Sequence, residues 1–264
     1  MSLVFSLGLL LIVGAAIGFL GGVVGIGGGL LAIPFLVLAM GFEQQAAQGS
    51  ALLMVLPAVL LTLYNYHKLA PIPWRPALAG ASTSVLFTWF GAKLALGLDP
   101  LVLQRSYAGF IFCLALYYFY QSKYASQPRS TNSSAPSHCL PLKRVCSGYH
   151  FVLVGVLAGL VGGIFAVGGS VVVVPLLTTV FGFSQFRAQA LGLTMIVPGI
   201  FVALVTYAYH GQVEWSAGLP LAVGGLLLVP FGVRLAHKLA EARLRLIFAW
   251  TLLGITFLMF FSVQ

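Results

Sequence analysis

Charge is scarce in this chain. Of its 264 residues only 6% are charged, and Asp and Glu together number 4, whereas 60% are hydrophobic. Soluble domains carry about 25% charged residues, and a soluble fold of this size could not hide so much apolar surface from water. The composition therefore excludes an ordinary soluble protein and predicts that lipid surrounds most of the chain.

The acidic groups that an intramembrane enzyme or a carboxylate proton relay would need are also missing. No pair of Asp or Glu and no Ser/His dyad lies inside the apolar segments, which argues against hydrolysis at membrane depth. The cysteines are few, and Cys139 and Cys146 with His138 and His150 match no standard zinc spacing. We expect no enzyme activity, no metal and no cofactor.

Alternation of polar and apolar residues, which marks the strands of membrane barrels, is absent as well. The chain has long apolar runs instead, such as Ser147 to Phe181, and in lipid such runs satisfy their backbone only as helices. A net charge of +9 would suggest nucleic acid for a soluble protein, but here the basic residues lie in loops, where they set topology and meet anionic lipid. We predict an all-α polytopic membrane protein with lipid, and no nucleic acid, as its partner.

The sequence overlays on itself without gaps after a shift of 141 positions, the separation of Gly18 and Gly159 (159 − 18). The same shift brings Pro34 to Pro175 and Trp74 to Trp215. Other equivalent pairs are Gly27 and Gly168, Gln48 and Gln189, Met54 and Met195, and Lys93 and Arg234. Chance similarity of apolar segments does not keep one offset across Gly, Pro, Gln and Trp. We predict two homologous halves, residues 1–121 and 148–264, joined by a polar linker over residues 122–147.

Each half contains three ordinary apolar spans that follow a segment broken by glycine. The expected spans are residues 45–66, 75–97, 101–121, 186–209, 215–237 and 242–262. The breaks are Gly25-Ile-Gly-Gly-Gly29 and Ala166-Val-Gly-Gly-Ser170. Glycine costs about 1 kcal/mol relative to alanine inside a helix, and the piece after the first break, residues 29–40, would be only about 18 Å long. This predicts a discontinuous or re-entrant helix pair rather than a full crossing.

Charge patterning supports the re-entrant interpretation. If each broken segment returns to its own side, all lysines and arginines except Lys93 and Arg105 fall on one side of the membrane, and Glu43, Asp99 and Glu214 fall on the other. Each half then crosses an odd number of times, so the two halves are inverted repeats, as in many secondary transporters. We expect a cell (inner) membrane protein with both termini outside and the central loop in the cytoplasm.

The broken helices predict an anion site at the membrane midplane. A helix that begins after such a break directs free N–H groups and a positive dipole end toward the centre, and glycine lets an anion approach the backbone closely. Two alternatives remain: the glycines serve only close helix packing, or the scaffold is an anion-selective channel.

The quoted stretches GIGGGLLAIP, GFEQQAAQGSALLMVLPA and YNYHKLAPIPW resemble the TauE/SafE sulfite exporter family, also called TSUP. Gly25, Gly27, Gly28, Gly29, Pro34, Gln48 and Ser50 match its first motif. The second copy departs from that pattern, because Ala166 and Ser170 replace the first and third glycines. The resemblance implies transport of sulfite, organosulfonates such as sulfoacetate, or related anions, with proton coupling expected.

Two groups of side chains are the candidate functional residues. The expected substrate-binding residues are Gly25, Gly27, Gly28, Gly29, Gln48, Ser50, Gly168, Gly169, Ser170, Arg187, Gln189 and Thr194. The expected proton-coupling or gating residues are Tyr64, His67, Lys93, Tyr207 and His210. Amides and hydroxyls donate to sulfonate oxygens without charge, and histidine titrates near neutral pH. The plainer alternatives are interhelical hydrogen bonds, a topology charge at Arg187, interfacial aromatic residues and a snorkelling Lys93.

Overall fold

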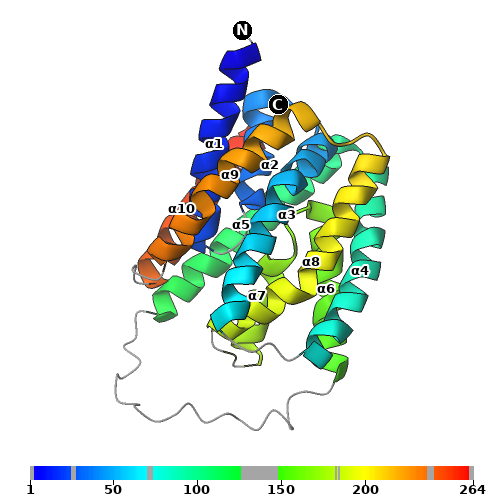
Figure 1. Ribbon diagram of the computed structural model, residues 1–264, viewed down its shortest axis with the longest axis vertical. Helices are drawn as coiled ribbons and strands as arrows, with labels where there is room; N and C mark the ends of the chain where they lie inside the picture. Colours follow the sequence, from blue (N-terminus) through cyan, green and yellow to red (C-terminus); the bar gives the residue numbers. More distant parts are fainter. Residues whose placement is uncertain are drawn as a thin grey trace.

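The computed structural model describes residues 3–24, 28–69, 74–125, 148–181, 183, 185–236 and 241–261, and over these residues the chain forms ten helices and no strand. Figure 1 shows the helices gathered into one bundle. In chain order they are α1 (Leu3–Val24), α2 (Gly29–Met40), α3 (Gln44–Leu69), α4 (Trp74–Gly97), α5 (Pro100–Ala125), α6 (Gly148–Phe165), α7 (Ser170–Thr179), α8 (Gln185–Tyr209), α9 (Trp215–Ala236) and α10 (Glu241–Phe261). The all-helical prediction is confirmed.

The helix pairs at the start of each half are discontinuous, as the glycine pattern predicts. α2 begins and ends at the expected residues, and α7 is shorter still at 10 residues. Within the described residues, four stretches are long and apolar enough to cross a membrane, namely Gln44–Tyr64, Pro100–Gln121, Arg187–Tyr209 and Trp215–Gly232. Of the six expected spans, those on α4 and α10 are missing from this set. Ser, Thr and Lys93 dilute the hydropathy of α4, and on α10 only the apolar stretch Ala249–Phe260 lies within the described side chains.

The strongest helix contacts join one half to the other. α1 packs most extensively on α9, and α6, the equivalent of α1, packs most extensively on α4, the equivalent of α9. α5 also contacts its own equivalent α10, and α3 contacts α8. The halves are therefore interlocked. When each helix is replaced by its equivalent in the other half, the same pairs of helices are in contact, as a twofold axis between the halves would require.

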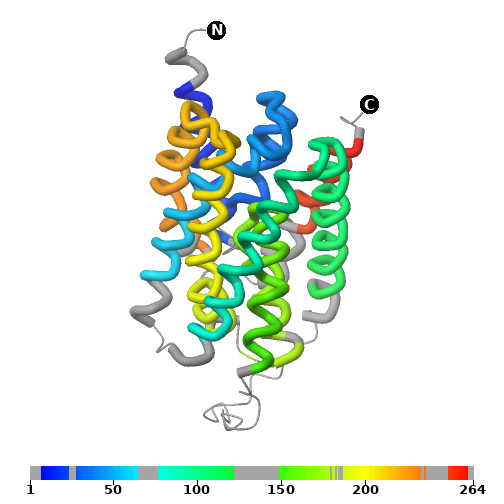
Figure 2. The backbone as a smooth tube through the Cα atoms, turned by 90° about the vertical axis from the view of Figure 1, so that its right-hand side faces the viewer, coloured from blue at the N-terminus to red at the C-terminus, as the bar shows by residue number. Residues whose placement is uncertain are grey.

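The two halves also begin at opposite ends of the bundle. Figures 1 and 2 show both chain termini at one end, whereas α5 finishes and α6 starts at the other. α1 and α6 consequently run into the molecule in opposite directions. The orientation of each half relative to a membrane stays a prediction.

Glycines four residues apart line the two largest interfaces. Cβ atoms added to Gly14, Gly18 and Gly22 of α1 would collide with the backbone of Leu221, Gly225 and Val229 on α9. In the other half, Gly155, Gly159 and Gly163 of α6 meet Gly80, Ser84 and Thr88 of α4 in the same way. Such small residues let helix backbones touch in lipid. These six glycines, which precede the breaks, therefore serve close helix packing.

Candidate functional site at the two helix breaks

Both short helices begin directly after a glycine in the left-handed conformation. Gly28 precedes α2 with a φ of 79°, and Gly169 precedes α7 with a φ of 69°. L-residues with a Cβ rarely adopt this conformation, so glycine permits the chain to reverse into the short helix here. Neither helix start has a side-chain cap.

The first backbone amides of each short helix precede its first helical hydrogen bond, and that of Ser170 in α7 donates to the Gly168 carbonyl at 2.9 Å. The carbonyl of Gly28 accepts from the amides of Leu31 and Ala32, and the carbonyl of Gly169 accepts from Val172 and Val173. The amides that precede these first bonds have no acceptor within their own helix. Each break thus presents the positive end of a helix inside the protein.

The two breaks lie against each other. A Cβ added to Gly29 would lie 3.7 Å from the carbonyl oxygen of Ala166, so the start of α2 reaches the second break. Val55 of α3 lies between them, because its methyl groups approach the Cβ positions of both Gly29 and Gly168. This geometry agrees with the expectation that the two glycine breaks face one another.

A buried hydrogen-bonded pair joins α3 and α8 beside the second break. The Tyr207 hydroxyl donates to Gln48 Oε1 at 2.8 Å and lies 3.4 Å from the carbonyl oxygen of Gly163 on α6. Both side chains are 0% exposed. Sequence reasoning placed Tyr207 at the mouth of a span, but the structure places it in the interior against the other half.

Two buried donors near the breaks have no partner within the described part of the chain. Gln48 Nε2 makes no hydrogen bond although its amide oxygen is bound by Tyr207, and Ser170 Oγ, on the first residue of α7, makes none either. An unsatisfied buried polar group costs about 1–3 kcal/mol. A bound ion or ligand is one explanation for such a group.

Other predicted binding residues already make hydrogen bonds within the protein. The Ser50 hydroxyl donates to the carbonyl oxygen of Ala46 at 2.7 Å and accepts from the Glu214 amide at 2.9 Å, which ties α3 to the loop before α9. The Thr194 hydroxyl donates to the carbonyl oxygen of Ala190 at 2.8 Å. Gln189 is half-buried, and Arg187 is exposed near the start of α8.

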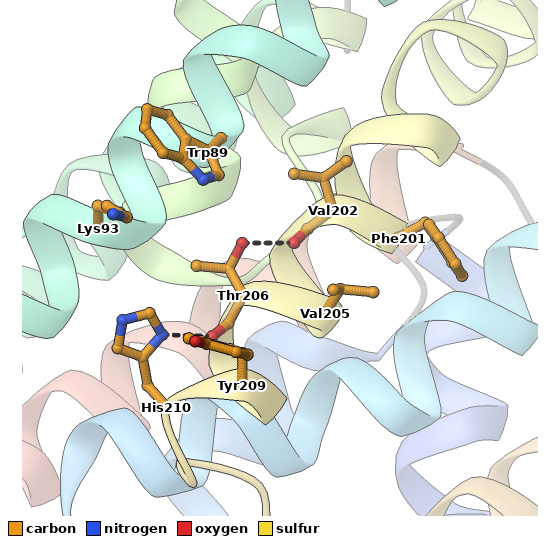
Figure 3. Close-up of a pocket in the computed structure, with 8 residues that line it drawn as sticks. All are labelled: Trp89, Lys93, Phe201, Val202, Val205, Thr206, Tyr209 and His210. Atoms are coloured by element: carbon orange, nitrogen blue, oxygen red, sulfur yellow. Dashed lines mark hydrogen bonds between the residues drawn. The ribbon is translucent and has the colours of Figure 1, made fainter.

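Two of the predicted coupling residues share a pocket between α4 and α8. Lys93 of α4 and His210, just after α8, both line it, and Figure 3 shows them toward one end of the pocket with Phe201 toward the other. Lys93 Nζ lies 4.8 Å from the centre of the Trp89 ring. His210 Nδ1 is 2.8 Å from the carbonyl oxygen of Thr206, and a carbonyl only accepts, so that nitrogen carries the proton.

The remaining predicted residues lie apart from this pocket or cannot be placed. Tyr64 is exposed on α3. The His67 side chain lies outside what the structure describes, although its backbone belongs to α3, and Gly25 and Gly27 also fall outside the described residues. The structure therefore brings Gly28, Gly29, Gly168, Gly169 and Ser170 to one place, with Gln48 and Tyr207 beside the second break.

Tyr107 is a buried residue that sequence reasoning missed. Its hydroxyl donates to the carbonyl oxygen of Leu30 in α2 at 3.2 Å. That carbonyl would normally accept from the residue four positions later, which is Pro34 and has no N–H. A proline inside an expected helix was the available signal, because it leaves one carbonyl that needs another donor.

Comparison with known proteins adds to this picture. The family described as Sulfite exporter TauE/SafE matches residues 10–259. The chain belongs to the TauE/SafE sulfite exporter family. Its relatives include proteins called "Probable membrane transporter protein" from three organisms. The protein of Methanocaldococcus jannaschii is 25% identical, with 94% of this chain and 92% of its own length covered. That of Xylella fastidiosa is 27% identical over 92% and 88%, and that of Haemophilus influenzae is 26% identical over 96% and 97%.

No solved structure matches the chain significantly. Membership of the TauE/SafE family, together with these transporter relatives, identifies a membrane transporter and not an enzyme. The helix breaks, the packed glycines and the buried Gln48–Tyr207 pair are thus features of a transporter interior.

Proposed function

We propose that this chain is a secondary transporter of small sulfur-containing anions, such as sulfite or organosulfonates like sulfoacetate, and that the anion binds between the two helix breaks. One observation carries the proposal: two uncapped helix starts meet inside the protein, and the buried donors Gln48 Nε2 and Ser170 Oγ near them have no partner among the described residues. The family name contributes the sulfur anion, since nothing in the geometry distinguishes sulfur from other oxyanions.

The proposed site would bind an anion without a buried cation. Backbone N–H groups at a helix start favour negative charge, and amide and hydroxyl groups donate to its oxygens. Each such charge-assisted hydrogen bond contributes about 1.5–3 kcal/mol, so a few of them hold an anion with moderate affinity. Binding of that strength suits a transporter, which must release its substrate on the other side. Gln189 and Thr194 of α8 are the proposed second-half contributors.

Proton coupling is part of the same proposal. His67 lies near the end of α3 and His210 follows the end of α8, and imidazole exchanges protons near neutral pH. Tyr207 would connect the site to α8 through its bond to Gln48. With no Asp or Glu in the predicted spans, we expect the proton to travel through these groups or on the anion itself.

We further propose that the two halves are inverted repeats in the cell membrane, with the termini outside and the central loop in the cytoplasm. The opposite starting ends of α1 and α6 support this arrangement, as does the exchange of helix contacts between halves. The two breaks would then form one site that the halves expose in turn to each side.

Flux in proteoliposomes tests the function. Purified protein would be given sulfite, sulfate, thiosulfate, sulfoacetate and a matched carboxylate, with and without an imposed pH gradient. We expect saturable uptake of a sulfur anion that the pH gradient accelerates. Conductance that never saturates would instead favour the anion channel.

Variants locate the site. Gln48→Leu and Ser170→Ala remove the unpartnered donors, and we expect each to raise the half-saturating anion concentration about tenfold, the loss of one charge-assisted hydrogen bond. Gly109→Ala is the matched control, because nothing lies within 4 Å of its Cβ position. Unchanged kinetics in both donor variants, with folded protein by size-exclusion chromatography, would contradict the site. Absence of sulfur-anion flux in the parent protein would contradict the substrate.

A further inference from the structure

The pocket between α4 and α8 differs from the helix breaks in both position and chemistry. It encloses about 390 Å³, within the usual range for small-ligand sites. Trp89 and Lys93 of α4 form one wall, and Phe201, Val205, Tyr209 and His210, on and just after α8, form the other (Figure 3). Neither Gln48 nor Ser170 is among its lining residues.

The pocket is amphipathic along its length. Its apolar end is at Phe201 and its basic end is at His210, nine positions later, which is about 14 Å along a helix. At the basic end, Lys93 stacks over the Trp89 ring and has no carboxylate partner among the described residues. At the apolar end, the lining is aromatic and aliphatic.

The pocket opens to the side of the bundle. Phe201, Val205 and Tyr209 are spaced four residues apart on α8 and are all exposed, and Trp89 and Lys93 are exposed on α4. On a membrane protein such a lateral face meets lipid. Tryptophan and tyrosine beside a lysine are typical of the level where lipid headgroups lie.

We propose that this pocket binds an anionic phospholipid, with its phosphate beside Lys93 and an acyl chain along Phe201 and Val205. Charge complementarity supports this occupant, since an unpaired ammonium group attracts an anionic headgroup. A second copy of the chain fits less well, because a twofold contact through this face would bring the two Lys93 side chains together. Lys93 then serves a lipid contact rather than gating.

Native mass spectrometry of the full chain in detergent tests the proposal. The protein would be titrated with phosphatidylglycerol or phosphatidylcholine carrying the same acyl chains. We expect phosphatidylglycerol to bind more tightly than phosphatidylcholine. Lys93→Gln should lower the affinity for phosphatidylglycerol about fivefold, because one lysine near an anionic headgroup contributes about that much. Binding of phosphatidylcholine should change little.

Matched variants separate this site from general surface charge. Arg105→Gln removes another exposed basic residue, on α5, and should leave phosphatidylglycerol binding unchanged. Val205→Trp fills the pocket and should weaken both lipids, whereas Val102→Trp, on the exposed face of α5, should not. All variants must keep the elution volume and melting temperature of the parent protein; a variant that loses either is replaced by Lys93→Met or Val205→Phe.

Three results would overturn the proposal. The first is equal weakening by Lys93→Gln and Arg105→Gln, which would mean nonspecific charge attraction. The second is displacement of the lipid by glycerol phosphate at the same concentration, which would mean a site for a free phosphate. The third is a dimer that Val205→Trp disrupts without any change in lipid binding, which would mean a protein interface.

Discussion

At the scale of single residues, two kinds of glycine follow one another in each half. Gly14, Gly18 and Gly22 have no room for a side chain because the backbone of α9 touches them. Gly28 is required by its left-handed backbone. The sequence shows both kinds as one glycine-rich stretch, and only the contacts separate the packing glycines from those of the break.

The Tyr207 hydroxyl is expected to hold Gln48 in place. Tyr207→Phe would leave the buried Gln48 Oε1 without its donor and should lower the free energy of unfolding by about 1–3 kcal/mol. Thermal melting in detergent measures this loss. Tyr209→Phe is the control, since that side chain is 87% exposed, and equal effects of the two changes would refute a special role for the buried hydroxyl.

The backbone at the first break should resist any side chain. Gly28→Ala places an L-residue at a φ of 79°, which costs about 1–2 kcal/mol, and its Cβ would press on Met54 and Ile17. Gly41→Ala has the same backbone cost with open space around its Cβ. We expect Gly28→Ala to lower the melting temperature more than Gly41→Ala; the reverse order would show that packing at the break is loose.

At the scale of helices, α2 depends on a residue from another helix. Its Pro34 leaves the Leu30 carbonyl without a helical donor, and Tyr107 of α5 supplies one. The sequence predicted the bounds of α2 correctly because its glycine and proline positions are local signals. It could not predict Tyr107 as the donor, because residues 30 and 107 meet only in the folded bundle.

A double-mutant cycle tests this contact. Tyr107→Phe alone should destabilise the protein by about 1–3 kcal/mol, since it leaves the buried Leu30 carbonyl unsatisfied. With Pro34→Ala also present, the new amide can bond to Leu30 within α2, so Tyr107→Phe should then cost much less. The free energies of the four proteins come from denaturant or thermal unfolding, and strictly additive effects would disprove the compensation.

The interface between α1 and α9 should not accommodate added side-chain atoms without a loss of stability. Gly18→Ala forces a methyl group against the Gly225 backbone, and overpacking of this kind costs about 1–3 kcal/mol. Gly8→Ala in the same helix meets nothing within 4 Å and serves as the control. We expect only Gly18→Ala, and not Gly8→Ala, to lower the melting temperature. Similar melting temperatures of the two variants would mean that α1 can move away from α9.

At the scale of the whole molecule, the halves are repeats in sequence but not separate bodies in space. α1 is held by α9 and α6 by α4, so each half completes the packing of the other. The linker boundaries at residues 122–147 stay a prediction from sequence. The interlocked arrangement implies that neither half would fold alone, because each would expose the glycine-lined face of its first helix.

Cysteine accessibility tests the proposed orientation. After Cys113, Cys139 and Cys146 are replaced by serine, single changes Ser133→Cys in the linker and Ser216→Cys at the start of α9 would be probed in intact cells with a membrane-impermeant maleimide. We expect labelling of the Ser216→Cys protein only, with Ser133→Cys labelled after permeabilisation. Labelling of Ser133→Cys in intact cells would reverse the orientation.

Composition, repeat offset and glycine pattern by themselves determined that this is an all-helical membrane protein with broken helices at the start of each half, because these depend on local backbone preference and on the cost of charge in lipid. Tertiary structure alone decided which side chains meet. It buried Tyr207 against Gln48, occupied the hydroxyl of Ser50, and put Lys93 and His210 in a lateral pocket. These contacts join residues far apart in the chain, and local sequence preference does not specify which side chains of two packed helices meet.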